Sequence, residues 1–252
     1  QRISAQGQFT VKNASTMRIG YLNFDAMGRH SENPMNDVRV RRAIAHAIDR
    51  ESIVNALVGG ESIVVHSLCF PSQFGCTQDV PKYDYDPEKA KQLLAEAGYP
   101  NGFETPFLAY RNRDFAEAMI NNLNAVGIKT NFEYLKYAAF RDKVQDGGSP
   151  FNFGTWGSYS INDVSAITSH FQSGGKDDYS KDAEVIKQLA IGDSSVDPDV
   201  RKDAYKAALS RISGEVFMFP LWSYNTWYAF SKDVDFNPTS DEIPRFFTAK
   251  WM

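Results

Sequence analysis

The sequence of 252 residues is poor in the residues and motifs that catalysis and metal binding usually require. It has two cysteines and four scattered histidines, and the spacing C-x6-C without a neighbouring histidine pair is wrong for a zinc site. No G-x-S-x-G elbow, P-loop, G-x-G-x-x-G turn or H-E-x-x-H motif occurs. These absences favour a binding protein over an enzyme, and we expect neither a metal nor another cofactor.

Two further absences narrow the choice of partners. The chain has no run of basic residues and a formal net charge of −4, so we expect neither nucleic acid nor an anionic membrane as a partner. It has no apolar run long enough to span a bilayer. It begins with Gln1 rather than Met, which is typical of a processed protein or of a piece of a longer one.

The two cysteines flank a short loop that contains proline and glycine, SLCFPSQFGC. Cys69 and Cys76 could close a small disulfide in an oxidising compartment, or they could be two free, partly buried thiols. Of these alternatives the disulfide is the one we expect.

Hydrophobic periodicity predicts an α/β fold, with glycine following several of the helices. Residues 9–24 read as two strands joined by a polar turn at 13–16, and residues 216–230 as two buried strands broken by a turn. Other strands are expected at 105–110, 128–135 and 151–156, and helices from 37 and at 53–58, 86–97, 114–126, 138–144, 164–171, 182–191 and 197–213.

The helix that starts at Asp37 carries a basic face opposite its apolar stripe. Such a face is usually solvated or paired with carboxylates. The basic residues are Arg39, Arg41, Arg42 and Arg50, and the carboxylates nearby are Asp37, Asp49 and Glu51.

Residues 151–163, FNFGTWGSYSIND, join a buried strand to a loop of hydrogen-bonding residues. Gly154 and Gly157 leave space for a ligand or another backbone. In α/β sheets ligands bind beyond the carboxyl ends of strands, where this loop is expected. The alternative is a solvated turn in which Asn162 or Asp163 caps the next helix. The candidate ligand-binding residues in the loop are Trp156, Ser158, Tyr159, Ser160, Asn162 and Asp163.

Residues 36–60 (NDVRVRRAIAHAIDRESIVNALVGG), 85–103 (YDPEKAKQLLAEAGYPNGF) and 124–144 (NAVGIKTNFEYLKYAAFRDKV) resemble the family 5 solute-binding proteins of ABC importers, as does 197–229. Members of that family take up peptides, nickel complexes, opines and some sugar conjugates. The resemblance implies a lobe of the periplasmic-binding-protein type II kind, with a mixed sheet flanked by helices. It also implies that the chain is truncated relative to the full two-lobed clamp.

The same resemblance implies how the chain is divided and where it acts. Residues 15–225 correspond to the second, ligand-binding lobe, while 1–14 and 226–252 correspond to pieces of the first lobe. The implied protein is periplasmic, or extracellular and membrane-anchored, and monomeric. It is not an enzyme, and it delivers a small-molecule ligand to the membrane subunits of an ABC permease.

The resemblance also indicates the kind of ligand. Relatives that bind peptides place an acid a few residues after the Trp, where it pairs with the α-amine. The matching position here is Tyr159, and a phenol cannot supply that negative charge. A polar ligand such as an opine, a sugar conjugate or a modified peptide is therefore expected. The alternatives are an ordinary di- or oligopeptide with Asp163 as amine acceptor and, more weakly, a hydrolase that uses Ser158 or Tyr159.

Residues outside the loop complete the predicted site. The segment LAYRNRD resembles the place where some relatives bind a ligand carboxylate through an arginine, which would be Arg111 or Arg113 here. Both could instead be surface charges at the start of a helix. Tyr21, Asn23 and Phe70 are further candidates for lining the site.

Overall fold

A mixed five-stranded sheet with strand order β3-β2-β4-β1-β5 organises the chain. The computed structural model describes residue 3 and residues 7–252. Strand β2 pairs in parallel with β3 and β4, whereas β1 pairs antiparallel with β4 and β5. The mixed sheet expected from the sequence is therefore confirmed. Its strands are β1 (Phe9–Phe24), β2 (Phe103–Ala109), β3 (Ile128–Tyr134), β4 (Phe151–Trp156) and β5 (Met218–Ser231).

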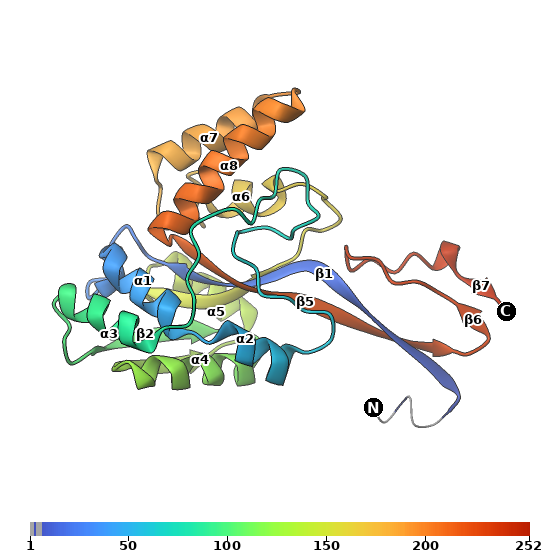
Figure 1. Cartoon of the computed structure of the whole chain (residues 1–252), viewed down its shortest axis with the longest axis horizontal. Helices are drawn as coiled ribbons and strands as arrows, with labels where there is room; N and C mark the ends of the chain where they lie inside the picture. Colours follow the sequence, from blue (N-terminus) through green and yellow to red (C-terminus); the bar gives the residue numbers. More distant parts are fainter. Residues whose placement is uncertain (1–2, 4–6) are drawn as a thin grey trace.

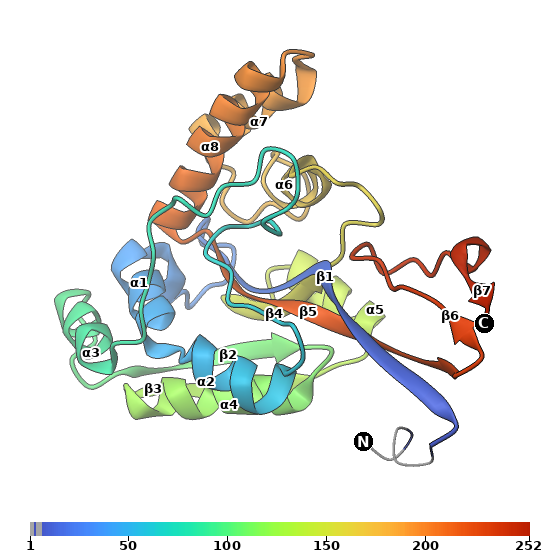
Figure 2. The same ribbon diagram turned by 45° about the vertical axis from the view of Figure 1, so that its right-hand side comes forward.

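Helices cover both faces of the sheet (Figure 2). Strand β2 shows the division, because Phe107 faces the core under the first set of helices and Leu108 packs with Phe140 and Val144 on the other side. The first set comprises α1 (Val38–Ala47), α2 (Arg50–Ile53), α3 (Pro87–Glu96) and α4 (Arg113–Ala125). The second set comprises α5 (Tyr137–Gln145), α6 (Ser165–Phe171), α7 (Ala183–Ser194) and α8 (Pro198–Glu215).

Helices α1, α3, α7 and α8 each begin after an aspartate whose carboxylate accepts a backbone N–H of the first turn. This capping satisfies amide groups that have no partner within the helix. It explains why the starts of these helices could be predicted closely from the sequence. Within residue 3 and residues 7–252, none of the helices has the length and apolar character that a membrane crossing needs.

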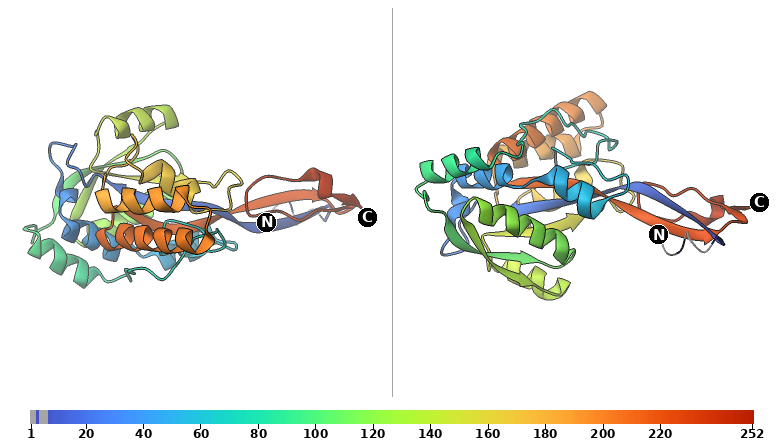
Figure 3. Two further views of the ribbon diagram at one scale, coloured as in Figure 1. Left: turned by 90° about the horizontal axis from the view of Figure 1, so that it is seen from above. Right: turned by 60° about the horizontal axis from the view of Figure 1, so that its bottom comes forward.

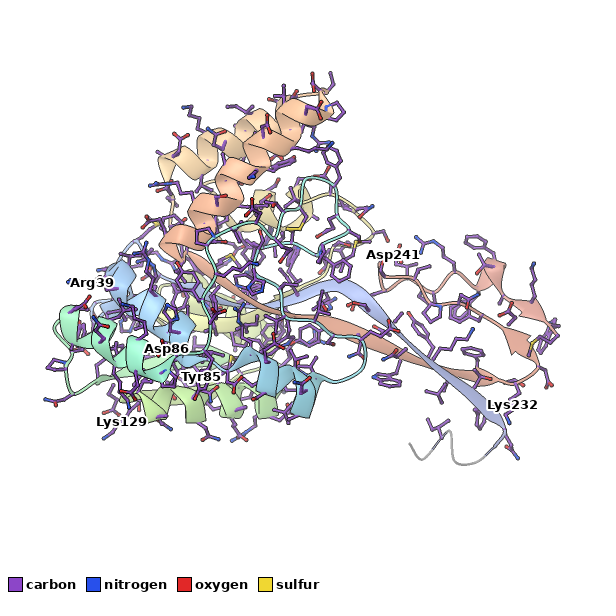
Figure 4. The ribbon with its side chains drawn as sticks, in the orientation of Figure 1. Arg39, Tyr85, Asp86, Lys129, Lys232 and Asp241 are labelled. Atoms are coloured by element: carbon purple, nitrogen blue, oxygen red, sulfur yellow. A yellow bond between two sulfur atoms is a disulfide. The ribbon has the colours of Figure 1, made fainter. Side chains whose placement is uncertain are left out.

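Strands β1 and β5 continue beyond the helical body as a two-stranded arm (Figures 1 and 3). Residues 9–15 of β1 pair there with residues 225–231 of β5. The chain then forms β6 (Val234–Asp235) and β7 (Lys250–Trp251), which pair with each other. Figure 4 labels Lys232 at the far end of the arm and Asp241 where the tail returns toward the body. The Met17 N–H donates to the Ser240 carbonyl at 2.7 Å and fixes this return.

The prediction of two strands in each of these regions was wrong, because β1 and β5 are each continuous. The polar residues 13–16 do not form a turn. They lead into an irregularity of the ladder, where Ser15 pairs with Asn225 and the next partners are Ile19 and Ser223. The Thr16 hydroxyl donates to the Tyr224 carbonyl at 3.0 Å, so a side chain supplies a bond where the regular ladder is interrupted.

Two arginines of the predicted basic face are buried and bind carbonyls instead of carboxylates. Arg50 donates to the carbonyls of Val65, Pro220 and Tyr83 at 2.9, 3.0 and 2.9 Å. Burial lowers the pKa of Arg50 to about 10. Arg41 likewise donates to two buried or partly buried carbonyls at 2.6 and 2.9 Å. The guanidinium group of Arg50 ties two loop segments to β5, and that of Arg41 ties the segment before α1 to the end of α8.

Candidate functional site

The turn after β4 presents polar side chains to solvent at the carboxyl end of the strand. Phe151 and Phe153 are fully buried, whereas Tyr159 is 68% exposed. Tyr159 and Ser160 have φ angles of +50° and +70°, a left-handed conformation that is costly for residues other than glycine. Asn162 is also exposed. A strained turn displaying polar groups at this edge is typical of a ligand-binding segment.

The loop closed by the cysteines holds this turn in place. Cys69 and Cys76 form a disulfide, as predicted. The Phe74 N–H donates to the Asn162 carbonyl at 3.1 Å, and the Gln73 amide donates to the Ile161 carbonyl at 3.2 Å. The disulfide therefore restrains a loop whose backbone and side chains fix the candidate ligand turn. Phe70 lies in the same loop and is half-buried.

Asp163 is engaged within the protein. Its carboxylate accepts the Ser165 N–H at 2.9 Å, at the start of α6, and the Arg201 guanidinium at 2.7 Å. The N-cap position of α6 is Val164, so the expectation that Asn162 or Asp163 is the N-cap was wrong, although Asp163 binds an N–H of the first turn from one position further back. An amine of a ligand would have to compete with Arg201 for the same oxygens.

Two guanidinium groups converge on the Thr155 hydroxyl, one residue before Trp156. Arg111 Nη1 lies 3.2 Å and Arg18 Nη1 lies 3.4 Å from Thr155 Oγ1, and the Tyr110 hydroxyl lies 3.3 Å away. The hydroxyl oxygen accepts from the two guanidinium groups with its two lone pairs, which leaves its own O–H to donate to the Tyr110 oxygen. Arg111 makes no salt bridge to a carboxylate in the described part of the chain. This edge therefore offers donors to an anionic or strongly polar ligand.

Arg18 reaches this edge from the stretch of β1 between Ser15 and Ile19, where the pairing with β5 is irregular. Its Nε donates to both carboxylate oxygens of Glu242, at 2.9 and 3.1 Å. Gly157 makes room for this pair, since a Cβ there would lie 2.8 Å from Arg18 Nη2 and 2.8 Å from Glu242 Oε2. The space left by Gly157 thus holds an ion pair between β1 and the tail.

Arg113 lies elsewhere, in the first turn of α4. Its side chain is 63% exposed and pairs with Glu117 at 2.7 Å, one helical turn along. Of the two arginines considered for a ligand carboxylate, Arg111 is placed at the edge beside Thr155. Arg113 matches the alternative prediction of a surface charge at a helix start.

Trp156 and Ser158 are largely committed to contacts within the protein. The indole N–H donates to the Ala166 carbonyl at 2.8 Å, and the ring stacks on His170 with centroids 4.3 Å apart. Ser158 is buried, and its hydroxyl lies 3.4 Å from the Met17 sulfur. A ligand would therefore contact the remaining exposed part of the indole and the exposed turn beyond it.

Tyr21 and Asn23 are buried in β1, between β4 and β5. The Tyr21 ring fills the space left by Gly154, where a Cβ would lie 2.9 Å from it. Burial raises the pKa of Tyr21 well above its usual value. These two residues support the sheet beneath the turn and are not part of its exposed surface.

The sequence reasoning missed several residues that the structure brings to the edge. Arg18 lies near the predicted turn at 13–16, but nothing in the local sequence pattern indicates that its side chain meets Thr155 and Glu242. Glu242 lies in a tail without periodicity, and its contact spans 224 positions of sequence. The other residues missed in this way are Tyr110, Thr155 and His170.

Known proteins share this architecture. The structure of DppA from Helicobacter pylori, an ABC transporter-associated periplasmic binding protein in complex with peptide STSA, matches 99% of this chain and 50% of its own (TM-score 0.87, 22% identity). AgaA from A. tumefaciens R10, in complex with agropinic acid, matches 93% of this chain and 49% of its own (TM-score 0.78, 26% identity). The fold is thus that of a periplasmic binding protein.

Sequence comparison defines the family. The pattern of the bacterial extracellular solute-binding proteins, family 5 middle region, matches residues 1–178. The chain belongs to this family. It is 33% identical over 139 residues to the heme-binding protein A of Haemophilus influenzae and 30% identical over 139 residues to the dipeptide-binding protein of Escherichia coli. Each match covers 52% of this chain and 25% of the relative, so the matched segment is about a quarter of their length.

Proposed function

We propose that this chain is the ligand-contacting part of the solute-binding component of an ABC importer. It captures a polar small molecule, such as an opine, a sugar conjugate or a modified peptide, and delivers it to a membrane permease without transforming it. The observation that carries the proposal is the convergence of Arg18 and Arg111 on Thr155, beside the turn whose residues 159–162 are exposed. Family membership supports the same role.

The charge of this edge favours a ligand with a carboxylate or a similar acidic group. Arg18 and Arg111 bring two positive charges, and Glu242 offsets one of them. The ligand's acid would bind the Arg111 fork through charge-assisted hydrogen bonds. Asp163 is engaged by Arg201, and the position expected for an amine-binding acid holds Tyr159. The likeness to AgaA, solved with agropinic acid, supports an acidic polar ligand.

An ordinary di- or oligopeptide is the alternative ligand, favoured by the dipeptide-binding relative and by the peptide-bound neighbour. In that case the ligand amine would displace the Arg201 guanidinium and pair with the Asp163 carboxylate in its place. A peptide library screened against opines and sugar conjugates by calorimetry separates the two proposals. Preferential binding of unmodified peptides would support the alternative.

We further propose that residues 15–225 form one lobe of a clamp, and that 1–14 and 226–252 contribute to the other. Support comes from the arm and tail, which carry aromatic side chains without cover in the described structure. Phe246, Phe247 and Trp251 are 71%, 86% and 82% exposed, which is typical of a surface that another element covers.

The disulfide supports a periplasmic or extracellular location, where thiols are oxidised. We propose that the assembled protein is a monomer.

Arginine variants test the ligand site directly. Arg111→Gln removes one charged donor, and we expect ligand affinity to fall by about 1.5–3 kcal/mol, at least roughly tenfold. Arg113→Gln is the matched control, because it removes the same charge two positions away and outside the edge. The measurement is calorimetry of the native ligand, recovered from the protein that combines this chain with its complementary lobe. If Arg111→Gln and Arg113→Gln bound the ligand with equal affinity, the assignment of Arg111 to the ligand site would be wrong.

Two substitutions test the turn in the same assay. Tyr159→Asp adds a negative charge near Arg18, and Trp156→Ala removes the ring against which Tyr159 packs. We expect each to weaken binding of the native ligand by at least roughly tenfold, about 1.4 kcal/mol. Tyr159 is exposed, so its replacement should leave the fold intact. Unchanged titrations would show that the ligand binds elsewhere.

A further inference from the structure

The ring of His170 covers one face of Trp156. The two rings are nearly parallel, with centroids 4.3 Å apart and an interplanar angle of 19°. His170 belongs to α6, and the same short helix supplies the Ala166 carbonyl that accepts the indole N–H at 2.8 Å. Phe171 meets both rings edge-on, at 5.2 Å from Trp156 and 4.5 Å from His170. One helix therefore determines the tilt and position of the indole.

His170 is itself anchored by a nearly buried carboxylate. Its Nε2 lies 3.0 Å from Asp177 Oδ2, and the Asp177 side chain is 8% exposed. Arg141, from α5, donates to both oxygens of Asp177 at 2.7 Å, and the Gln145 amide donates at 3.3 Å. Burial alone would raise the pKa of Asp177, but the hydrogen bonds from His170, Arg141 and Gln145 hold it well below the usual range. The ionised carboxylate thus fixes the proton on Nε2.

This anchoring exceeds what packing requires. The His170 side chain is 36% exposed, and a leucine or phenylalanine at this point of α6 would cover the indole without any polar partner. Here the ring is instead oriented through a chain of contacts from Arg141 to Asp177, to His170 and to Trp156. The carboxylate that holds the imidazole is itself held by Arg141, and the Tyr179 hydroxyl lies 3.5 Å from it.

We infer that His170 is a positioning residue for the ligand site: held by Asp177, its ring sets the orientation of Trp156 and of the turn that follows it. This inference rests on the proposed function, because it assigns the turn as the ligand surface. The geometry of the stack itself is independent of the ligand, so it can be tested on the chain alone.

Intrinsic fluorescence gives a direct readout, since the emission of an indole depends on the groups packed against its ring. The emission of Trp156 is isolated by subtraction of the Trp156→Phe variant. We expect this emission to change in His170→Ala, which removes the stacked ring. In His170→Phe, which keeps a ring in the stack, the change should be smaller. Identical Trp156 emission in the wild-type chain and in His170→Ala would overturn the inference.

Collisional quenching by acrylamide separates positioning from simple coverage. In Asp177→Asn every atom that touches Trp156 is retained, but the anchor of His170 is weakened. Positioning predicts that acrylamide reaches Trp156 more readily in this variant, whereas a merely covering ring predicts no change, and the latter result would refute the inference. Neither readout depends on ligand. A failure here therefore leaves the Arg111→Gln test of the proposed function unaffected.

Discussion

Removal of the Cys69–Cys76 disulfide should lower stability and loosen the ligand turn. The bond joins residues separated by seven positions. In the chain-entropy model, closing a ring of about eight residues reduces the entropy of the unfolded chain by about 8 cal/mol/K, which corresponds to about 2.5 kcal/mol at 25 °C. We expect the Cys69→Ser, Cys76→Ser double variant to lose about this much free energy of unfolding. Its melting temperature should fall by about 5 °C.

The assay is urea denaturation of the wild-type chain with and without reductant, and of the double variant without it. The reduced wild-type chain and the variant should agree, because both lack the same constraint. A midpoint that does not change would contradict the calculation. A change of slope without a change of midpoint would instead indicate altered compactness of the denatured state.

The local effect is tested by hydrogen exchange. The amides of Phe74 and Val164 bond to carbonyls across the interface between the disulfide loop and the turn, at 3.1 and 3.0 Å. Their exchange should accelerate most in the double variant, while amides in the β2–β3 ladder serve as the control. Uniform acceleration at both places would show that the disulfide acts only on global stability and does not hold the turn.

Two other predictions follow from strain and charge. Ser160→Gly should raise the free energy of unfolding by about 0.5–1 kcal/mol, because glycine adopts the φ of +70° without strain. Thermal denaturation measures this gain, and a destabilised variant would contradict the strain argument. Asp177→Asn should cost about 2 kcal/mol at neutral pH through its bonds to Arg141 and His170. The pKa of Asp177 is lower in the folded state than in the unfolded state. Its contribution to the free energy of unfolding is therefore fully present above the pKa of the unfolded state, near ~4, and is lost as the pH falls through the pKa of the folded state. Urea titrations across the acid range should therefore show a flatter pH dependence in the variant, and parallel curves would contradict this assignment.

The sequence predicted the elements of the body well, because their signals are local. Asp86 followed by Pro87 specified the start of α3, and the apolar run from Phe151 specified β4. The polar residues 13–16 were assigned wrongly as a turn. Such residues are typical of turns, but here pairing with β5 keeps β1 extended through an irregularity. Local propensity could not reveal a pairing between residues some two hundred positions apart.

The candidate site was predictable only in part, for a related reason. The turn after Trp156 could be found from its own composition and from the rule that ligands bind at strand ends. Its electrostatic partners could not, since Arg18 and Glu242 come from opposite ends of the chain. The commitment of Asp163 to Arg201 was hidden as well, because α8 meets the turn only in three dimensions. Buried Arg50 shows that a basic stripe need not face water.

The central claim is that the residues after Trp156, together with Arg111, form the ligand surface. The most direct measurement is a crystal structure of the protein that combines this chain with its complementary lobe, purified with its native ligand. The account predicts an acidic group of the ligand within hydrogen-bond distance of Arg111 and polar groups within reach of residues 158–162. A ligand bound away from this edge, with the turn facing only solvent, would contradict it.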